Sequence, residues 1–281
     1  MGLLNTITFK RIEELKDIMK VVELQAEIWS SEIVSPQPQL VASIHHGGIL
    51  VGAFAEEKLV GFSYGFAGFN NEGPYLVSHM TGILPEYQNA GIGYHLKLKQ
   101  REWAIDYGYK KIVWTYDPLE VRNGYFNVCK LGAYSKRYIP SYYGELNDKL
   151  NKGLPTDRLL IEWDICTKRV ENAILGMSKN QIENLYETLI NCEQASEFSS
   201  PIPLKIKDKY SQAGFRVPVP SNIQFIKQQK PEVAHEWRYA VRAAITEAFS
   251  KDYIITGVQK EHNSKIHYYI LKNKLVEGSH D

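Results

Sequence analysis

Six consecutive residues, from Gln88 to Gly93, have the composition of a site that binds phosphate. They follow an apolar, strand-like run, Tyr75 to Leu84, and open a run with helical spacing, Tyr94 to Tyr107. A glycine-broken turn between a strand and a helix presents free backbone N–H groups at the positive end of the helix dipole. Such a turn predicts a site for a phosphate or pyrophosphate, which the absence of side chains at Gly91 and Gly93 lets approach the backbone.

Two better-known phosphate loops do not fit this segment. The dinucleotide fingerprint needs a third glycine three residues after Gly93, and Leu96 stands there. The P-loop needs Gly-Lys-Ser/Thr, which the residues after Gly93 do not supply. A glycine-softened start of a helix that binds nothing remains the alternative.

The wider context of the loop resembles a known family. The run Ile83 to Gly93 resembles the acyl-CoA pyrophosphate loop of the GNAT superfamily of N-acetyltransferases, with the pattern Gln/Arg-x-x-Gly-x-Gly/Ala. Lys130-Leu131-Gly132-Ala133 resembles that family's second motif, Lys/Arg-x-Gly-Phe. The resemblance covers residues 5–165, and the stretch from Trp114 to Asn127 is similar to a subgroup of predicted acetyltransferases with a C-terminal extension.

This resemblance implies a co-substrate, acetyl-CoA or another acyl-CoA, and no metal. In the family, main-chain groups of the strand before the loop hold the pantetheine arm, which implies Thr81 and Ile83. The pyrophosphate would lie on the loop itself, formed by Gln88, Asn89, Ala90, Gly91, Ile92 and Gly93. Asn123 and Asn127 match the side that faces the pantetheine or the adenosine in relatives.

Transfer of an acyl group to an amine needs a base, because only the neutral amine attacks. His79 is the candidate base, since strand alternation predicts that it shares a face with Thr81 and Ile83 and since imidazole titrates near neutral pH. A structural histidine bonded to a carbonyl is the alternative. Glu32 is a second candidate base, with a surface or acceptor-contacting carboxylate as its alternative.

The sequence departs from the family at the usual general acid. Many members place a tyrosine four residues before the glycine of the second motif, and Val128 stands at that position. The acid that protonates the departing thiolate is therefore unassigned. Five nearby tyrosines, or water, could replace it: Tyr125, Tyr134, Tyr138, Tyr142 and Tyr143.

Hydrophobic periodicity predicts the elements that position these residues. A short strand at 6–10, helical spacing through 12–29, a second helix ending near 46 and a hairpin of runs 49–55 and 59–67 precede the loop. Strands follow at 111–116 and 157–165. This order fits the fold class that the resemblance implies: an α/β GNAT fold with a mixed, mostly antiparallel sheet flanked by helices, plus a smaller C-terminal α/β segment.

We expect three parts: a GNAT acyl-CoA-binding domain at 1–168, a helix and Pro/Ser-rich connector at 169–220, and a C-terminal α/β segment at 221–281. The composition of 196–220 leaves little room for regular structure. Beyond it the pattern predicts a strand at 223–226, a helix at 231–250 and strands at 253–258 and 267–271.

Arg238 and Arg242 lie one turn apart on the predicted helix, beside an apolar face. Paired arginines can bind a carboxylate of the acceptor or of the acyl group. The alternative is that they tie the helix to its neighbour through Glu236 or another acid. We expect residues 200–275 to pack on the first domain and line the acceptor side. The rival is a homodimer interface remote from the cofactor cleft.

The composition excludes several classes of function. The 281 residues carry a net charge of +1, which gives no electrostatic reason to bind nucleic acid or a membrane surface. No apolar stretch or N-terminal pattern predicts a membrane span or a signal peptide. Three widely spaced cysteines and the adjacent pair His45-His46 predict neither disulfides nor a metal site, and free thiols fit a cytoplasmic protein.

These observations predict an acyl-CoA-dependent N-acyltransferase that transfers an acyl group, by default acetyl, directly to a small amine or amino acid in a ternary complex. Neutral net charge argues against polybasic protein tails as acceptors. A module that binds or senses acyl-CoA without turnover, or a GNAT-fold interaction scaffold, remains the alternative.

Overall fold

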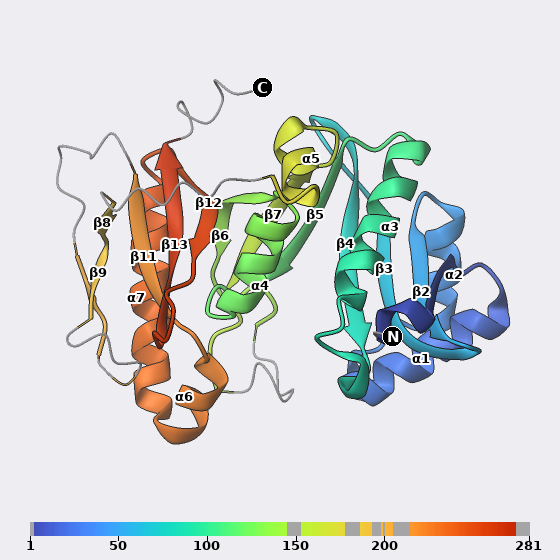
Figure 1. Ribbon diagram of the computed structural model, residues 1–281, viewed down its shortest axis with the longest axis horizontal. Helices are drawn as coiled ribbons and strands as arrows, with labels where there is room; N and C mark the ends of the chain where they lie inside the picture. The colour runs from blue at the N-terminus through green and yellow to red at the C-terminus, as the bar shows by residue number, and fades with distance from the viewer. Residues whose placement is uncertain are drawn as a thin grey trace. The chain divides into compact units, whose positions relative to one another are not determined.

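The computed structural model describes residues 3–144, 153–177, 186–192, 198, 200–204 and 214–273. The chain forms two compact units, which we call the first unit (Met1–Trp114) and the second unit (Thr115–Asp281). Figure 1 shows the helices and strands of each unit.

The first unit is built on a sheet in the order β1-β2-β3-β4-β5. Pairing is antiparallel from β1 to β4 and parallel between β4 and β5. The residues of β2 and of the first half of β3 are mostly apolar, and they are buried on both faces of the sheet. These strands therefore form the centre of the core. The strands are β1 (Ile7–Arg11), β2 (Ile49–Ala55), β3 (Lys58–Asn70), β4 (Gly73–Ile83) and β5 (Lys111–Tyr116), whose last two residues open the second unit.

Helices cover both faces of this sheet (Figure 1). The helices are α1 (Leu15–Ile28), α2 (Gln37–His45) and α3 (Ile92–Tyr107). A Cβ atom on Gly82 would meet Ile28 of α1, whereas a Cβ atom on Gly61 would meet Ile92 of α3 and Ile83. Gly82 and Ile83 are adjacent in β4 and point to opposite faces. Hence α1 and α3 cover opposite faces of β4.

β4 changes its pairing on both edges near its midpoint. On the β3 side, Gly65 pairs with Ser78 and Tyr64 pairs with Met80, so His79 is the extra residue of a β-bulge. On the β5 side, the pairs of the described structure are Leu76 with Ile112 and Val77 with Val113. The end of the β5 pairing therefore coincides with the bulge, which bends β4 and frees its edge from Ser78 onward.

The second unit has a sheet in the order β7-β6-β12-β13-β11-β8 and a separate pair β9-β10. All these neighbours pair antiparallel except β11 and β8, which run parallel. The strands are β6 (Tyr134–Ile139), β7 (Arg158–Asp164), β8 (Glu187–Thr188), β9 (Ile190–Asn191), β10 (Ile202–Pro203), β11 (Phe215–Pro220), β12 (Tyr253–Gln259) and β13 (Ile266–Asn273).

The longest helix of the described second unit, α7 (Pro231–Phe249), packs on β6, β11 and β12. Trp237, Val241 and Ile245 are fully buried, which confirms the predicted apolar face. The shorter helices are α4 (Val121–Tyr125), the π-helix η4 (Phe126–Lys130), α5 (Lys168–Ile174) and α6 (Ile223–Gln229).

Two local predictions are wrong. Residues 223–226, predicted as a strand, begin α6, because the side chain of Asn222 accepts a hydrogen bond from the Phe225 amide and caps a helix. The connector, part of which lies outside the described residues, contains β11 despite Pro218 and Pro220. β8 pairs only with Phe215 and Arg216, so the edge beside both prolines needs no donor in the described structure.

The predicted fold class is confirmed, since both units combine mostly antiparallel strands with covering helices. α6, α7, β12 and β13 form the expected C-terminal α/β elements, and they share the second unit with β6 and β7. The domain boundaries expected at 168 and 220 stay predictions, because a compact structural unit need not coincide with an inherited domain.

Candidate active site

The glycine loop of the first unit joins β4 to α3 through a short 3-10 turn, η3 (Pro85–Tyr87). Gly91 is the N-cap of α3 with φ of +86°, a conformation that favours glycine. Asn89 is also left-handed, with φ of +61°. The Gly91 carbonyl accepts from the amides of Tyr94 and His95. Within the described chain no acceptor binds the amides of residues 89–93, so this row of donors is available to an anion.

The loop is also sterically open to a pyrophosphate. A Cβ atom on Gly91 would have only the end of the Leu4 side chain within 4 Å, at 3.9 Å. The first turn of α3 carries no acidic residue that would repel an anion. Gln88 donates from Nε2 to the carbonyl of Ile83 at 3.2 Å, which braces the loop against the end of β4. These features fit the pyrophosphate of an acyl-CoA.

The freed edge of β4 leads to this loop. Thr81 and Ile83 are half-buried and project toward α3. The hydroxyl of Thr81 lies 3.1 Å from that of Ser63 on β3. The β4 backbone beyond Ser78 has no β5 partner in the described structure and can offer hydrogen bonds to an extended ligand.

His79 does not lie where alternation predicts. Ser63 and Tyr64 are adjacent in β3 and point to opposite faces. Thr81 contacts Ser63, whereas the exposed ring of His79 packs edge-on against Tyr64, with centroids 6.1 Å apart. The expected common face of His79 and Thr81 is therefore wrong, because the bulge shifts the alternation. Partial burial lowers the pKa of His79, which leaves the imidazole neutral at neutral pH.

Glu32, the second candidate base, lies in the 3-10 turn η2 (Ser31–Ile33) and is exposed. Its role stays a prediction. Its position agrees with the alternative of a surface or acceptor-contacting carboxylate.

Lys97 was not predicted as a site residue, yet it is one of the most unusual side chains of the first unit. It lies on α3, is 5% exposed, and donates from Nζ to the hydroxyl of Ser78 at 2.7 Å. Nζ also lies 3.8 Å from the centre of the Trp114 ring. A sequence signal existed: Lys97 falls on the buried face of α3 with Leu96, Gln100 and Ala104.

In the second unit, the two predicted cofactor-binding asparagines differ in exposure. Asn123 is exposed on α4, and Asn127 is 4% exposed in the π-helix η4. Val128, at the usual position of the general acid, is 3% exposed and apolar. Gly132 of the second motif has φ of +75°, and a Cβ atom there would lie 2.9 Å from Ala173 of α5.

Two tyrosines that could replace the general acid are already bound to carboxylates. Tyr134 donates to Asp164 at 2.9 Å, and Tyr138 donates to Asp157 at 2.6 Å. Burial and the neighbouring carboxylates raise the pKa of both hydroxyls above the ordinary value of tyrosine. A higher pKa makes both hydroxyls weaker acids, which does not favour either as the general acid.

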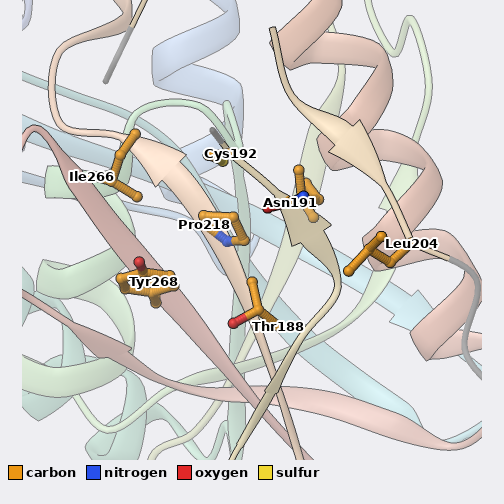
Figure 2. A pocket seen from close by; sticks show the side chains of 8 residues that line it. Thr188, Asn191, Cys192, Leu204, Pro218, Ile266 and Tyr268 are labelled. Atoms are coloured by element: carbon orange, nitrogen blue, oxygen red, sulfur yellow. The ribbon is translucent and has the colours of Figure 1, made fainter. Parts of the chain in front are cut away.

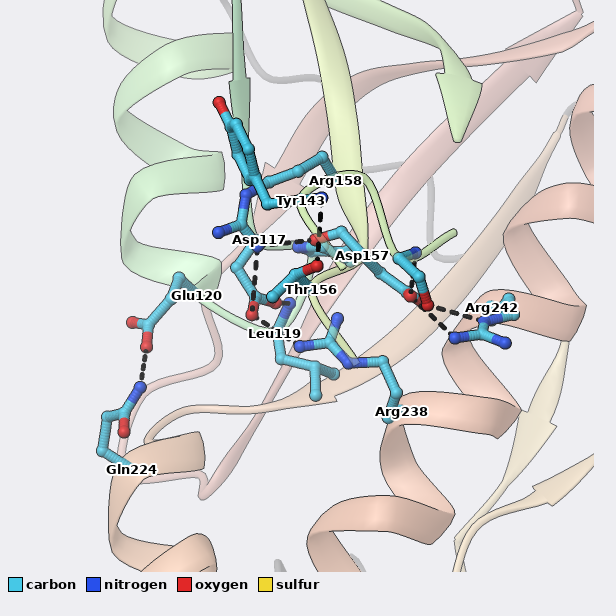
Figure 3. Close-up of polar contacts among 12 residues, drawn as sticks. Asp117, Leu119, Glu120, Tyr143, Thr156, Asp157, Arg158, Gln224, Arg238 and Arg242 are labelled. Carbon is cyan, nitrogen blue, oxygen red and sulfur yellow. Dashed lines mark hydrogen bonds and ion pairs between the residues drawn. The ribbon is translucent and has the colours of Figure 1, made fainter. Parts of the chain in front are cut away.

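Arg238 and Arg242 both contact carboxylates (Figure 3). Arg242 binds Asp157 with two hydrogen bonds of 2.8 and 2.7 Å. Arg238 is fully buried and donates from Nη2 to Asp117. These contacts support the alternative that both arginines have a structural role. The acids that bind them are Asp117 and Asp157 instead of Glu236. The Nε and Nη1 atoms of Arg238 have no partner within the described chain.

A hollow of about 210 Å³ lies elsewhere in the second unit, where Thr188, Cys192, Pro218 and Tyr268 form part of its lining (Figure 2). Burial raises the pKa of the Cys192 thiol to about 11, so the thiol stays protonated and is a poor nucleophile. All three cysteines are free. No helix of the described residues is long and apolar enough to cross a membrane.

Comparisons with known proteins bear on the loop and the strands beside it. Residues 17–126 match the family model described as Acetyltransferase (GNAT) family. A search of curated protein sequences found no match.

Solved structures matched to part of this chain include a protein of Streptococcus mutans UA159, with 18% identity over 56% of this chain and 99% of that one, at a TM-score of 0.47. The ribosomal-protein-S18-alanine N-acetyltransferase of Escherichia coli is 11% identical over 57% and 95% of the two chains, at 0.43. An aminoglycoside acetyltransferase from an uncultured soil metagenomic sample is 14% identical over 43% and 85%, at 0.38.

The family match covers β4, the glycine loop and α3, which are the elements that carry the predicted acyl-CoA site. It confirms the resemblance inferred from the loop and the expected class of enzyme. Residues 17–126 are therefore similar to the acetyltransferase domains of the GNAT family.

Proposed function

We propose that this protein transfers an acyl group, by default acetyl, from acyl-CoA to the amine of a small molecule or amino acid. The observation that carries the proposal is the row of backbone donors from residue 89 to residue 93 at the N-terminus of α3. This row continues the free edge of β4. Together they suit a ligand with a pyrophosphate at one end and an extended arm.

In this proposal the acyl-CoA and the acceptor bind together, and the acceptor amine attacks the thioester directly. The β4 backbone near Thr81 and Ile83 holds the pantetheine, and the amides from Asn89 to Gly93, with the Gln88 side chain beside them, hold the pyrophosphate. Asn123 and Asn127 are proposed to complete the cofactor side. His79 takes the proton from the attacking amine, which its neutral imidazole can accept.

The acceptor is proposed to carry a carboxylate, which binds to Arg238. Buried polar groups normally find partners, and two donors of this guanidinium have none in the described chain. Arg242 is the weaker candidate, because Asp157 already occupies it in a bidentate pair. We also place the protein in the cytoplasm, on the chemistry of its three free thiols.

A thiol-release assay with acetyl-CoA and longer acyl-CoA esters, over a panel of amino acids and their decarboxylated amines, tests this proposal. The expected result is turnover with at least one amino acid and a higher KM for the matching amine. Equal turnover of an amino acid and of its decarboxylated amine would contradict the proposed binding of an acceptor carboxylate. Absence of CoA binding would remove the proposal itself.

Val128 favours a second function, in which the domain binds acyl-CoA without turnover. Its buried, apolar side chain cannot donate a proton at the usual position of the acid. Tight binding of acetyl-CoA together with no thiol release over the whole panel would support this sensing role.

A further inference from the structure

Lys97 lies at the point where β4 and β5 part. The last pair that joins the two strands in the described structure is Val77 with Val113, and the next residues are Ser78 and Trp114. The ammonium of Lys97 contacts both, at 2.7 Å from the Ser78 hydroxyl and 3.8 Å from the centre of the Trp114 ring. It therefore spans the apex of the opening, on the side of α3.

A lysine in this position has no evident structural reason. No carboxylate pairs with it among the described residues, although burial of a charge normally requires such a partner. The charged form is held by a hydroxyl and by the face of an indole ring. Burial lowers the pKa of Lys97 to about 7, so near neutral pH it can both hold and release a proton.

A second polar group lies beside it without a partner. Gln100 follows Lys97 by one turn on α3 and is fully buried, and neither its Nε2 nor its Oε1 has a partner in the described chain. Its Nε2 lies 3.1 Å from the place of a Cβ atom on Gly65, the residue that pairs with Ser78. The polar groups that line the apex can therefore form hydrogen bonds with a ligand or with water.

Four other titratable groups on the elements packed around Lys97 are engaged elsewhere. His79 projects from the opposite face of β4 and packs against Tyr64 and Phe66. Tyr64 is bound to Ser43, Lys111 to Glu72, and Lys99 to Glu102. Burial is the cause of the lowered pKa of Lys97, and no neighbouring charge contributes to it.

The path of the proposed co-substrate leads to this apex. With the pyrophosphate on the loop, the pantetheine runs back along β4 from Ile83, and Ser78 lies about 16 Å away along the strand. The thioester would then reach the end of the opening, where β5 closes it. Ser78 and His79 flank this end on opposite faces of β4, with Lys97 behind Ser78.

We infer that Lys97 is the general acid of the reaction and protonates the sulfur of the departing CoA. This inference rests on the proposed function. When the tetrahedral adduct collapses, the C–S bond breaks and its electron pair goes to sulfur, which takes a proton from the Lys97 ammonium. The products are the amide and the CoA thiol. The attacking amine releases its proton to His79. This proton returns through solvent to the neutral amine of Lys97, which restores the ammonium.

If Lys97 is the acid, the CoA thiolate and the Lys97 ammonium stabilise each other in the complex, and this ion pair lowers the pKa of the bound thiol. The test follows the ultraviolet absorbance of the thiolate while the complex with CoA is titrated, with desulfo-CoA as the blank. In the wild type and in Lys99→Met, an exposed lysine of the same helix, the bound thiol should titrate at least about one pH unit below its value in Lys97→Met. Methionine keeps the length of the chain and suits a buried site.

The rate gives an independent reading. The kcat/KM of the wild type should fall as the pH rises through the pKa of Lys97, because the acid must be protonated, and Lys97→Met should lose this limb along with most of the rate. Failure of the wild type to bind CoA would overturn the proposed function. Normal CoA binding with the same thiol pKa in Lys97→Met would overturn the role of Lys97 alone. If that variant does not fold, a bound thiol in the wild type that titrates no lower than free CoA overturns it.

Discussion

Lys97 and His79 lie on opposite faces of β4, although the hydrogen-bond partner of Lys97, Ser78, directly precedes His79 in the sequence. The β-bulge at His79 produces this arrangement, and it also coincides with the end of the β5 pairing. A base on one face and an acid on the other would flank a thioester at the apex. Each side can be tested separately.

Replacement of Lys97 by methionine should change the pH dependence of stability. Burial holds the folded-state pKa of Lys97 near 7, below the unfolded value of 10.5. Between these values the unfolded chain binds a proton that the folded protein lacks, so the wild type gains stability as the pH rises. The free energy of unfolding of the wild type, relative to Lys97→Met, should rise by up to about 1.4 kcal/mol per pH unit from pH 7 to 10.

Denaturant unfolding at several pH values measures this difference, and Lys99→Met serves as the exposed control. A difference between the wild type and Lys97→Met that stays constant from pH 7 to 10 would contradict a neutral, buried Lys97.

Replacement of His79 by alanine should lower kcat about 100-fold while the Kd for CoA is unchanged, because the ring is proposed to act on the acceptor amine. The acidic limb of the rate profile should also disappear. Its midpoint in the wild type should lie below the ordinary histidine pKa, because burial lowers the pKa of His79. His45→Ala, at an exposed histidine of α2, is the control. An unchanged kcat in His79→Ala would leave the histidine with a structural role.

Arg242 should contribute to stability through its bidentate pair with Asp157, which is fully buried. Arg242→Ala leaves this carboxylate with only Tyr138 and the Ser141 amide, at an expected cost of about 2 to 3 kcal/mol in unfolding free energy. Burial opposes ionisation of Asp157, but these donors outweigh it and lower its pKa. The stabilisation is therefore present above the unfolded carboxyl pKa and is lost in stronger acid.

Unfolding at pH 7 and pH 3 checks this prediction, with the exposed Arg122→Ala as control. A loss no larger than that of the control at pH 7 would mean that the pair is not a structural anchor.

Gly132 should be essential for packing and not only for its backbone conformation. Gly132→Ala places a Cβ atom 2.9 Å from Ala173 and 3.0 Å from the backbone of α5, at a φ of +75°. Gly176→Ala has nearly the same φ, +70°, with nothing within 4 Å, and isolates the conformational cost. Gly132→Ala should lower the unfolding free energy by at least about 1 kcal/mol more than Gly176→Ala. Equal losses would refute the packing role.

The sequence predicted the elements well where periodicity and turn residues agreed. β5 was placed without error, and α3 began two residues before its predicted start because Gly91 caps it. The run 223–226 was too short for periodicity to separate strand from helix, and the Asn222 cap decided it. The face of His79 could not be predicted, since a bulge depends on the pairing of two strands and leaves no fixed local pattern.

Lys97 shows a different limit of sequence reasoning. Its place on the buried face of α3 was visible, but a lysine on such a face usually extends its ammonium to solvent. Only the packing of Ser78 and Trp114 around Nζ distinguishes it from an ordinary lysine. The acids that bind Arg238 and Arg242 are likewise distant in sequence, at residues 117 and 157.

Calorimetric titration of CoA against the wild type, Gly91→Ala and Gly108→Ala tests directly whether the glycine loop binds the pyrophosphate of CoA. Both glycines have a left-handed φ and cap the two ends of α3, so the alanine variants share the same backbone cost, while only Gly91 lies in the loop. Gly93→Val, which needs no left-handed backbone, is a second loop variant. Both loop variants should bind CoA at least about tenfold more weakly, or about 1.4 kcal/mol, and Gly108→Ala should bind like the wild type. Folded loop variants with an unchanged Kd would contradict this role of the loop.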